Sequence, residues 1–169
     1  MDRAERWVRR AVEVGAAEAK VISPGTVVTA TWVRLKCQYG CGGHGLRLTC
    51  PPYSPTPQQT RAMLDEYRVA LLVHNPGDAK WISIKDIVAD LEREIFLAGH
   101  YKAFAFGSGP CTLCDTCNLE HCDHPSRARP SMEAAGIDVY ATARGNGFPI
   151  DVVTDHDCPQ NYYGLVLIE

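Results

Sequence analysis

The sequence lacks the features that would assign it to a membrane, to secretion or to a nucleic acid. No apolar run approaches the roughly 18 residues that a membrane-spanning helix needs. The opening residues, MDRAERWVRRAVEV, carry scattered charges and no apolar core, so we expect no signal peptide. Seventeen Lys and Arg against 20 Asp and Glu give a net charge of −3 without a basic block, which argues against nucleic acid or an anionic membrane as a partner. We therefore expect a cytoplasmic protein.

The composition also lacks the marks of disorder and of collagen-like repeats, because 46% of the residues are apolar and 22% are charged. A chain of 169 residues has the length of one domain, which we expect to span residues 1–169 and to bury a core without disulfides. What is present in excess is cysteine, with eight residues. In a cytoplasmic chain thiols stay reduced, so clustered cysteines favour bound metal.

Four of the cysteines follow one another in the segment GPCTLCDTCNLEHCDHP, residues 109–125. They are Cys111, Cys114, Cys117 and Cys122, in the spacing C-x2-C-x2-C-x4-C. The bacterial ferredoxin run differs by one residue in its last gap. Zinc sites usually combine two separated C-x2-C pairs, so three cysteines spaced two residues apart fit one zinc ion poorly. The spacing predicts a [4Fe–4S] cluster, with structural zinc or unliganded thiols as alternatives.

Three further cysteines lie in KCQYGCGGHGLRLTCPP, residues 36–52. Cys37, Cys41 and Cys50 are interleaved with glycines that let backbone N–H groups approach cluster sulfurs. A flexible glycine loop with incidental cysteines is the alternative. Cys158 stands alone before a proline.

The ligand count leaves three arrangements open. Each trio could hold one cluster, with Cys122 and Cys158 as the fourth ligands. Alternatively, Cys111 to Cys122 complete one cluster, and the first trio holds a second whose open iron acts as a Lewis acid. A single shared cluster is the third arrangement, and it leaves thiols over.

Periodicity and capping signals predict an α/β fold. We expect helices over 2–14, from Thr56 to about Tyr67, over 81–98 and over 138–144, with a helix N-cap at Ser131 and a stop at Gly136. Strands are expected over 16–23, 68–75, 101–109 and 161–169, and the β-branched residues 26–36 are expected to run extended into the first cysteine loop. Pro76, Gly77 and Asp78 should form a turn.

Strand 68–75, helix 81–98 and strand 101–109 form a strand–helix–strand unit, which predicts a parallel crossover. The fold class expected is therefore a small, mostly parallel or mixed sheet flanked by helices. The four-cysteine segment leaves the carboxyl end of the second strand, so both cysteine loops should lie at one end of the sheet.

The second cysteine segment is flanked by Arg127, Arg129, His121 and His124. Cations beside a cluster of net negative charge would raise its reduction potential, although ordinary surface charge explains each residue equally well.

Three stretches resemble a known family: KCQYGCGGHGLRLTCPPYSPTPQQ, GPCTLCDTCNLEHCDHPSRARPSMEAAGIDVYATARGNG and the closing YYGLVLIE. They are similar to the prokaryotic proteins catalogued as predicted metal-binding protein, domain of unknown function 2284. The resemblance implies cytoplasmic proteins, common in anaerobes, that are presumed to bind iron–sulfur clusters without an established reaction. It places the family cysteines at Cys37, Cys41, Cys50, Cys111, Cys114, Cys117 and Cys122, with Cys158 outside the pattern.

Three functions are compatible with these residues. The leading hypothesis is an electron-transfer module with one or two [4Fe–4S] clusters and a redox partner protein. The second is an enzyme whose open-site cluster acts as a Lewis acid on a sulfur- or oxygen-bearing small molecule. The third is a zinc-stabilised interaction domain. The sequence identifies no catalytic residue and no oligomeric state.

Overall fold

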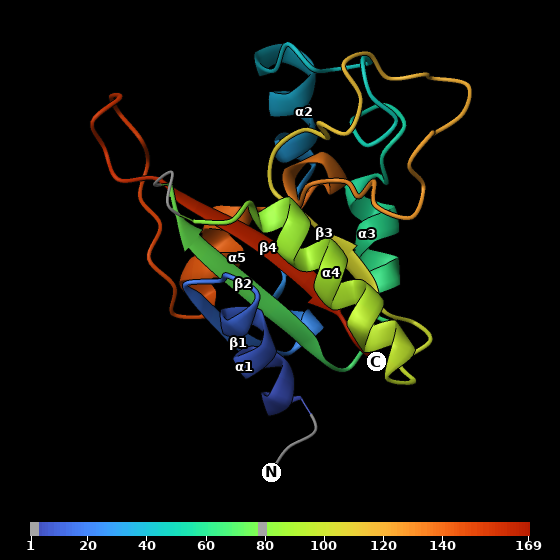
Figure 1. Ribbon diagram of the computed structural model, residues 1–169. Coiled ribbons are helices and arrows are strands. Elements are labelled where there is room, and N and C mark those ends of the chain that lie inside the picture. The colour runs from blue at the N-terminus through green and yellow to red at the C-terminus, as the bar shows by residue number, and fades with distance from the viewer. Residues whose placement is uncertain (1–3, 78–80) are drawn as a thin grey trace.

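The computed structural model describes residues 4–77 and 81–169, in which a four-stranded sheet lies between two layers of helices (Figure 1). The strands are β1 (Glu18–Ile22), β2 (Ala70–Pro76), β3 (Phe104–Phe106) and β4 (Asn161–Leu167). The α-helices are α1 (Glu5–Glu13), α2 (Thr31–Gly40), α3 (Pro57–Leu64), α4 (Ile84–Leu97) and α5 (Val139–Gly145). Two short 3-10 helices are η1 (Pro24–Thr26) and η2 (Glu133–Ala135). The expected α/β class is confirmed.

The direction of the strands differs from the expectation. The strand order is β1-β2-β4-β3 and all neighbouring strands are antiparallel, so the prediction of a mostly parallel sheet is wrong. β2 and β3, which α4 connects, do run in the same direction, because both are antiparallel to β4 between them. β4 begins where β2 ends, with Asn161 opposite Pro76, and so it must run back along β2.

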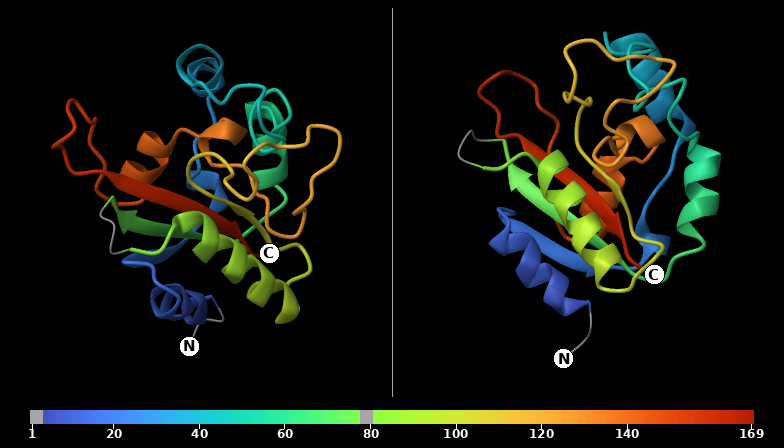
Figure 2. Two further views of the ribbon diagram at one scale, coloured as in Figure 1. Left: turned by 45° about the horizontal axis from the view of Figure 1, so that its top comes forward. Right: turned by 45° about the vertical axis from the view of Figure 1, so that its right-hand side comes forward.

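Each face of the sheet has its own core. Leu71 and Val73 of β2 pack with α1 and α4, whereas Ala70 and Leu72 pack with α3, η2 and α5 on the other face. Figure 2 shows these two layers from two further directions. This double covering explains why β2 is a continuous apolar run. In β4, Gly164 lets α4 approach closely, since a Cβ atom there would lie 2.6 Å from side-chain carbons of Ile84 and Val88.

Local capping signals placed most helix ends correctly. The hydroxyl of Thr56 accepts a hydrogen bond from the Gln59 N–H (3.2 Å), and the Gln59 side chain accepts one from the Thr56 N–H (2.8 Å). This capping box starts α3, which ends at Leu64 and not at Tyr67. Ser131 accepts a hydrogen bond from the Ala134 N–H (3.0 Å) at the start of η2. The predicted helix over 2–14 begins at Glu5, and its residues 2 and 3 lie outside the described residues, as does Asp78 of the predicted turn.

The segment before the first cysteine loop is helical, which corrects the prediction that residues 26–36 are extended. The β-branched residues end at Val33, and the following Leu35, Lys36 and Gln38 are good helix formers. Cys37 therefore lies on α2, in its last turn.

In the part of the chain that the structure describes, no helix has both the length and the apolar character needed to cross a bilayer.

Candidate metal centre

The first three cysteines form one cluster of thiols, here called the first thiol group (Cys37, Cys41 and Cys50). Cys37 lies on α2 and Cys41 is the residue that caps its end. Residues four apart on a helix lie on the same face, one turn apart, so both side chains point the same way. Cys50 is buried, with 9% of its surface exposed. The segment after it is fixed to α2 because the Arg34 guanidinium donates hydrogen bonds to the carbonyl oxygens of Pro52 (3.1 Å), Ser54 (3.3 Å) and Pro55 (3.0 Å).

The thiols of this group are close enough to affect one another's protonation. Burial raises the pKa of Cys37, and the neighbouring Cys41, Glu133 and Cys50 raise it further, while Arg34 opposes them. Burial also raises the pKa of Cys50, and the charge of Arg47 opposes the shift. Without a metal, these two thiols therefore keep their protons to a higher pH than a thiol in water.

One glycine of the first loop already provides an N–H group to a sulfur. The Gly43 N–H donates a hydrogen bond to Cys41 Sγ over 3.4 Å. Such bonds stabilise a thiolate and tune the potential of a cluster bound to it.

The other four cysteines form the second thiol group (Cys111, Cys114, Cys117 and Cys122), on the loop that follows β3. The loop is closed at its base, because the Gly107 N–H donates to the Pro130 carbonyl (2.9 Å) and the Met132 N–H donates to the Gly107 carbonyl (3.0 Å). Desolvation raises the pKa of Cys114, and the charges of Asp123 and the three other cysteines raise it further. The four sulfurs are therefore neighbours.

Two arginines fasten this loop to α4. Arg129 makes two hydrogen bonds with the Glu92 carboxylate (2.7 and 2.5 Å), and these side chains are 17% and 12% exposed. Arg127 pairs with Asp90 and, at 3.5 Å, with Asp86. Both arginines are thus occupied by carboxylates of α4, which explains them better than a role in raising the potential of a cluster.

The second thiol group surrounds a small cavity of about 20 Å³, which His121 and His124 also line. This volume is enough for about one water-sized body. This space is close to the size of a single ion, and a cluster would need more room.

The two groups meet at one point. The Arg47 Nε donates a hydrogen bond to the carbonyl oxygen of Cys111 (2.8 Å), and the charge of Cys111 contributes to the raised pKa of Cys50. Lys85, at the start of α4, donates to the Pro110 carbonyl and to the Thr112 hydroxyl, both at 3.0 Å. Both cysteine loops consequently lie together at one end of the molecule (Figure 1).

The donors suit a soft metal, but their arrangement is not that of a finished coordination site. Thiolates select Zn, Cu(I) and iron–sulfur clusters. Within residues 4–77 and 81–169, no three Cys, His, Asp or Glu side chains are placed so that they could already hold a metal ion. Binding would therefore have to draw the thiols of each group inward. This is expected where loops gain their final structure together with their metal.

Cys158 belongs to neither group. It lies on the segment between α5 and β4, which projects away from both cysteine loops in Figure 1. Its sulfur is hydrogen-bonded to the Thr154 hydroxyl at 3.4 Å, and this bond lowers the pKa of the Cys158 thiol.

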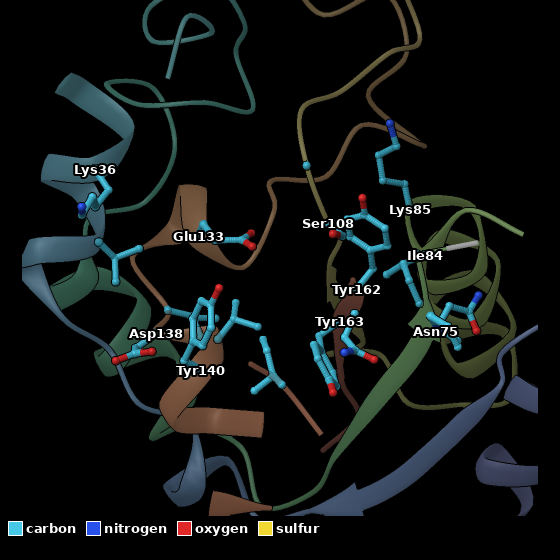
Figure 3. A pocket seen from close by; sticks show the side chains of 18 of the residues that line it. Lys36, Asn75, Ile84, Lys85, Ser108, Glu133, Asp138, Tyr140, Tyr162 and Tyr163 are labelled. Carbon is cyan, nitrogen blue, oxygen red and sulfur yellow. The ribbon is translucent and has the colours of Figure 1, made fainter. Parts of the chain in front are cut away.

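The first thiol group borders a large cavity of about 1150 Å³ (Figure 3). Its walls come from α2, η2, α5, the start of α4 and the ends of β2 and β4, and Cys37 and Cys41 are part of the α2 wall. Glu133 points into this space from η2 (Figure 3), and its carboxyl is surrounded by protein atoms on its other sides. Desolvation raises the pKa of Glu133, while hydrogen bonds from its own N–H and from Ser131 oppose the shift.

With this geometry established, a family model described as "Predicted metal-binding protein (DUF2284)" matches residues 20–168. The chain belongs to this family. The match confirms the resemblance seen in the two cysteine segments, and it shows a predicted metal-binding domain without naming the metal. No curated protein and no solved structure matches the chain.

The sequence of this DUF2284 protein showed the cysteines but not the large cavity. Trp32, Lys36 and Tyr163 line it, and nothing in their separate segments marks them as neighbours. The sequence did contain one signal for a shared helix face. The spacing of four residues between Trp32 and Lys36, and between Cys37 and Cys41, is typical of a helix.

Proposed function

We propose that this DUF2284 protein holds an iron–sulfur cluster at each thiol group and passes single electrons between cytoplasmic partners. The observation that carries the proposal is that thiols from two distant stretches lie near enough to raise one another's pKa, within each group and, through Cys111 and Cys50, between the groups. Two adjacent centres are what an electron relay needs. When bound, such clusters take up and release one electron at a time.

The chain's own residues would prepare the first site for its cluster. Arg34 and Arg47 favour the thiolate forms of Cys37 and Cys50, against the larger effect of burial. The N–H of Gly43 holds Cys41 Sγ in one orientation. Burial of Cys50 keeps water from that side of the group, which lowers the potential of a bound cluster.

The outer side of the second thiol group would receive a redox partner. Leu113 and Leu119 are each 39% exposed on this loop, beside the cysteines. Exposed apolar side chains near a redox centre favour brief contact with another protein, as weak electron-transfer complexes require.

The large cavity favours a second function, catalysis at the first thiol group. A [4Fe–4S] cluster is normally held by four cysteines, so a group of three leaves one iron free to bind another molecule. Because Cys37 and Cys41 line the cavity, a sulfur- or oxygen-bearing small substrate could reach that position. Here the metal would act as a Lewis acid.

The small cavity favours a third function, a zinc-stabilised interaction domain. Its 20 Å³ is closer to the size of a single ion than to that of a cluster, although the thiols would have to move inward to bind the ion. Zinc would then hold the second loop in place and leave Leu113 and Leu119 to bind a partner.

Metal analysis of anaerobically purified protein tests these functions. The relay predicts a brown protein with about eight iron atoms and as many sulfides, as two [4Fe–4S] clusters require. It also predicts a paramagnetic resonance signal after reduction that small ligands do not change. A signal that shifts with added small ligands would favour the enzyme. Colourless protein that contains zinc and no iron would contradict both and leave the interaction domain.

A further inference from the structure

The large cavity has the size and rigidity of a ligand site. Its 1150 Å³ slightly exceed the roughly 300–1,000 Å³ of typical small-molecule pockets. Its walls belong mostly to helices and strand ends on both sides of the gap, so the space does not depend on a single loop. A cavity built in this way is suited to hold a molecule of defined shape.

The apolar residues of the cavity lining indicate the shape and polarity of the main part of the ligand. Aromatic residues surround the space from three elements (α2, α5 and β4) and from the segment before α4: Trp32, Trp81, Tyr140, Tyr162 and Tyr163. Branched aliphatic residues fill much of the remaining wall, among them Ile84, Ile137, Val139 and Ile150. Aromatic side chains pack best against flat apolar surfaces. The lining therefore selects a flat, largely apolar body.

The charged residues of the cavity lining indicate which polar group the ligand would carry. Three cations line the cavity (Lys36, Lys85 and Arg144), against two acidic residues (Glu133 and Asp138), although the whole chain carries −3. A positive lining in an acidic protein favours an anion.

Most of these charged groups already have protein partners. Lys85 donates to oxygens of the second cysteine loop, and Arg144 donates to the Ile150 carbonyl (3.1 Å). Asp138 caps α5 by accepting a hydrogen bond from the Ala141 N–H (2.9 Å). In the described part of the chain, Lys36 has neither a hydrogen bond nor an ion pair. Lys36 therefore has its ammonium group available for a ligand.

We infer that the large cavity binds a small organic anion with a flat apolar body, whose anionic group pairs with Lys36 and whose body lies among the aromatic side chains. Lys36 and Trp32 are four residues apart on α2, so one helix face presents both the cation and an aromatic ring. Cys37 and Cys41 belong to the same wall. The ligand would thus lie against the first thiol group, and this last point rests on the proposed metal centre.

A pair of dyes tests the inference on metal-loaded, full-length protein. 8-Anilinonaphthalene-1-sulfonate has a flat apolar body with one negative charge, and N-phenyl-1-naphthylamine has the same ring system without the charge. We expect one site that binds the sulfonate more tightly than the amine. Lys36→Met should weaken sulfonate binding roughly fivefold, the effect of one partly exposed charge pair, and leave the amine unchanged. Arg93→Met removes an exposed cation that does not line the cavity, and should change neither.

A second variant and a second readout locate the site. Ser108→Phe places a ring in the cavity from the wall opposite Glu133 (Figure 3) and should weaken both dyes at least tenfold. In 1H–15N spectra, the sulfonate should shift the indole signals of Trp32 and Trp81. The indole signal of Trp7, which belongs to α1 and packs on the other face of the sheet, should stay in place. The indole measurement needs no cavity variant, so it holds even where Ser108→Phe fails to fold.

Three results would overturn the inference. They are equal binding of the two dyes, full sulfonate binding by a folded Ser108→Phe variant, and movement of the Trp7 signal alone. Iron-containing protein that binds neither dye refutes the ligand site and leaves the proposed function standing. Protein without iron that binds the sulfonate at Trp32 and Trp81 refutes the proposed function and leaves the ligand site standing.

Discussion

The two thiol groups are supported in different ways. The first group starts at the end of α2 and borders a cavity of about 1150 Å³. The second lies inside a loop that ion pairs hold against α4, around a cavity of about 20 Å³. One chain thus contains an open group next to a ligand-sized space and an enclosed group with exposed leucines outside it. The proposed functions would use this difference, because small molecules would reach the first group and a redox partner protein would reach the second.

Removal of one cysteine from each group gives the largest expected effect. Cys114→Ala should lose the metal of the second group, and with it about half of the iron, because it removes one of the four thiolates that would hold that metal. Cys37→Ala should lose the other half and spare the second group. Iron and sulfide analysis, with far-ultraviolet circular dichroism as a check on folding, measures both variants.

The two variants also test whether there are two centres. If one cluster were shared between the loops, either substitution would remove all the iron. Full iron content in Cys114→Ala would contradict the assignment of that cysteine. A protein that loses its fold in both variants would show that metal and fold are inseparable in this chain.

The attachment of the second loop gives the next largest effect. Arg129→Met should lower the free energy of unfolding by about 3 kcal/mol, because it leaves the poorly exposed carboxylate of Glu92 without its ion-pair partner. Glu92 also accepts a hydrogen bond from the Ala105 N–H (2.7 Å), so the loss would reach β3. Urea unfolding of the metal-loaded protein provides the measurement.

Arg127→Met is the matched control for the loop. Arg127 and its partner Asp90 have side chains that are 38% and 50% exposed, and such pairs contribute about 1 kcal/mol or less. Equal losses for the two arginines would show that burial of the Arg129 pair does not matter.

The sequence predicted those parts of the fold that depend on neighbouring residues. Thr56 and Gln59 signal the start of α3 by themselves, and the apolar stripe of α4 is complete within one segment. The order of the strands depends on β4, which comes from the end of the chain and separates β2 from β3. No local pattern records that insertion, so the parallel crossover looked like a parallel sheet.

The candidate site also has a part that the sequence predicted and a part that it did not. The spacing of the cysteines was visible, and it divided them into the same two groups that neighbour one another in the structure. The large cavity was not visible, because it is assembled from α2, α5, the start of α4 and the ends of two strands. The spacing of Cys37 and Cys41 was the missed clue, since it fits a helix better than the extended segment that the preceding valines and threonines favour.

A smaller effect is expected from Glu133, the acidic residue beside the first thiol group, on the pH dependence of stability. Desolvation raises the pKa of Glu133 in the folded protein. The protonated carboxyl therefore contributes stability that is fully present below the pKa of about 4.3 that Glu has in the unfolded chain. This stability is lost as the pH rises through the pKa of Glu133 in the folded protein. Glu133→Gln stays neutral and should gain stability relative to the parent protein as pH rises. Urea midpoints of both proteins, compared over about pH 5 to 8, give the measurement. Glu120→Gln, at an exposed position of the second loop, should show no such trend.

The smallest effect on metal is expected at Cys158, which serves as the reference for both groups. Cys158→Ser should keep the full metal content, because the sulfur of Cys158 interacts with Thr154 and with neither thiol group. The hydrogen bond with Thr154 lowers the pKa of Cys158, so a larger share of this thiol is thiolate near neutral pH and should react with iodoacetamide before the metal-bound cysteines do. Thr154→Val should slow that reaction, as mass spectrometry of the peptides would show. A loss of metal in Cys158→Ser would instead make Cys158 a ligand and would require the segment that carries it to fold over toward the first group.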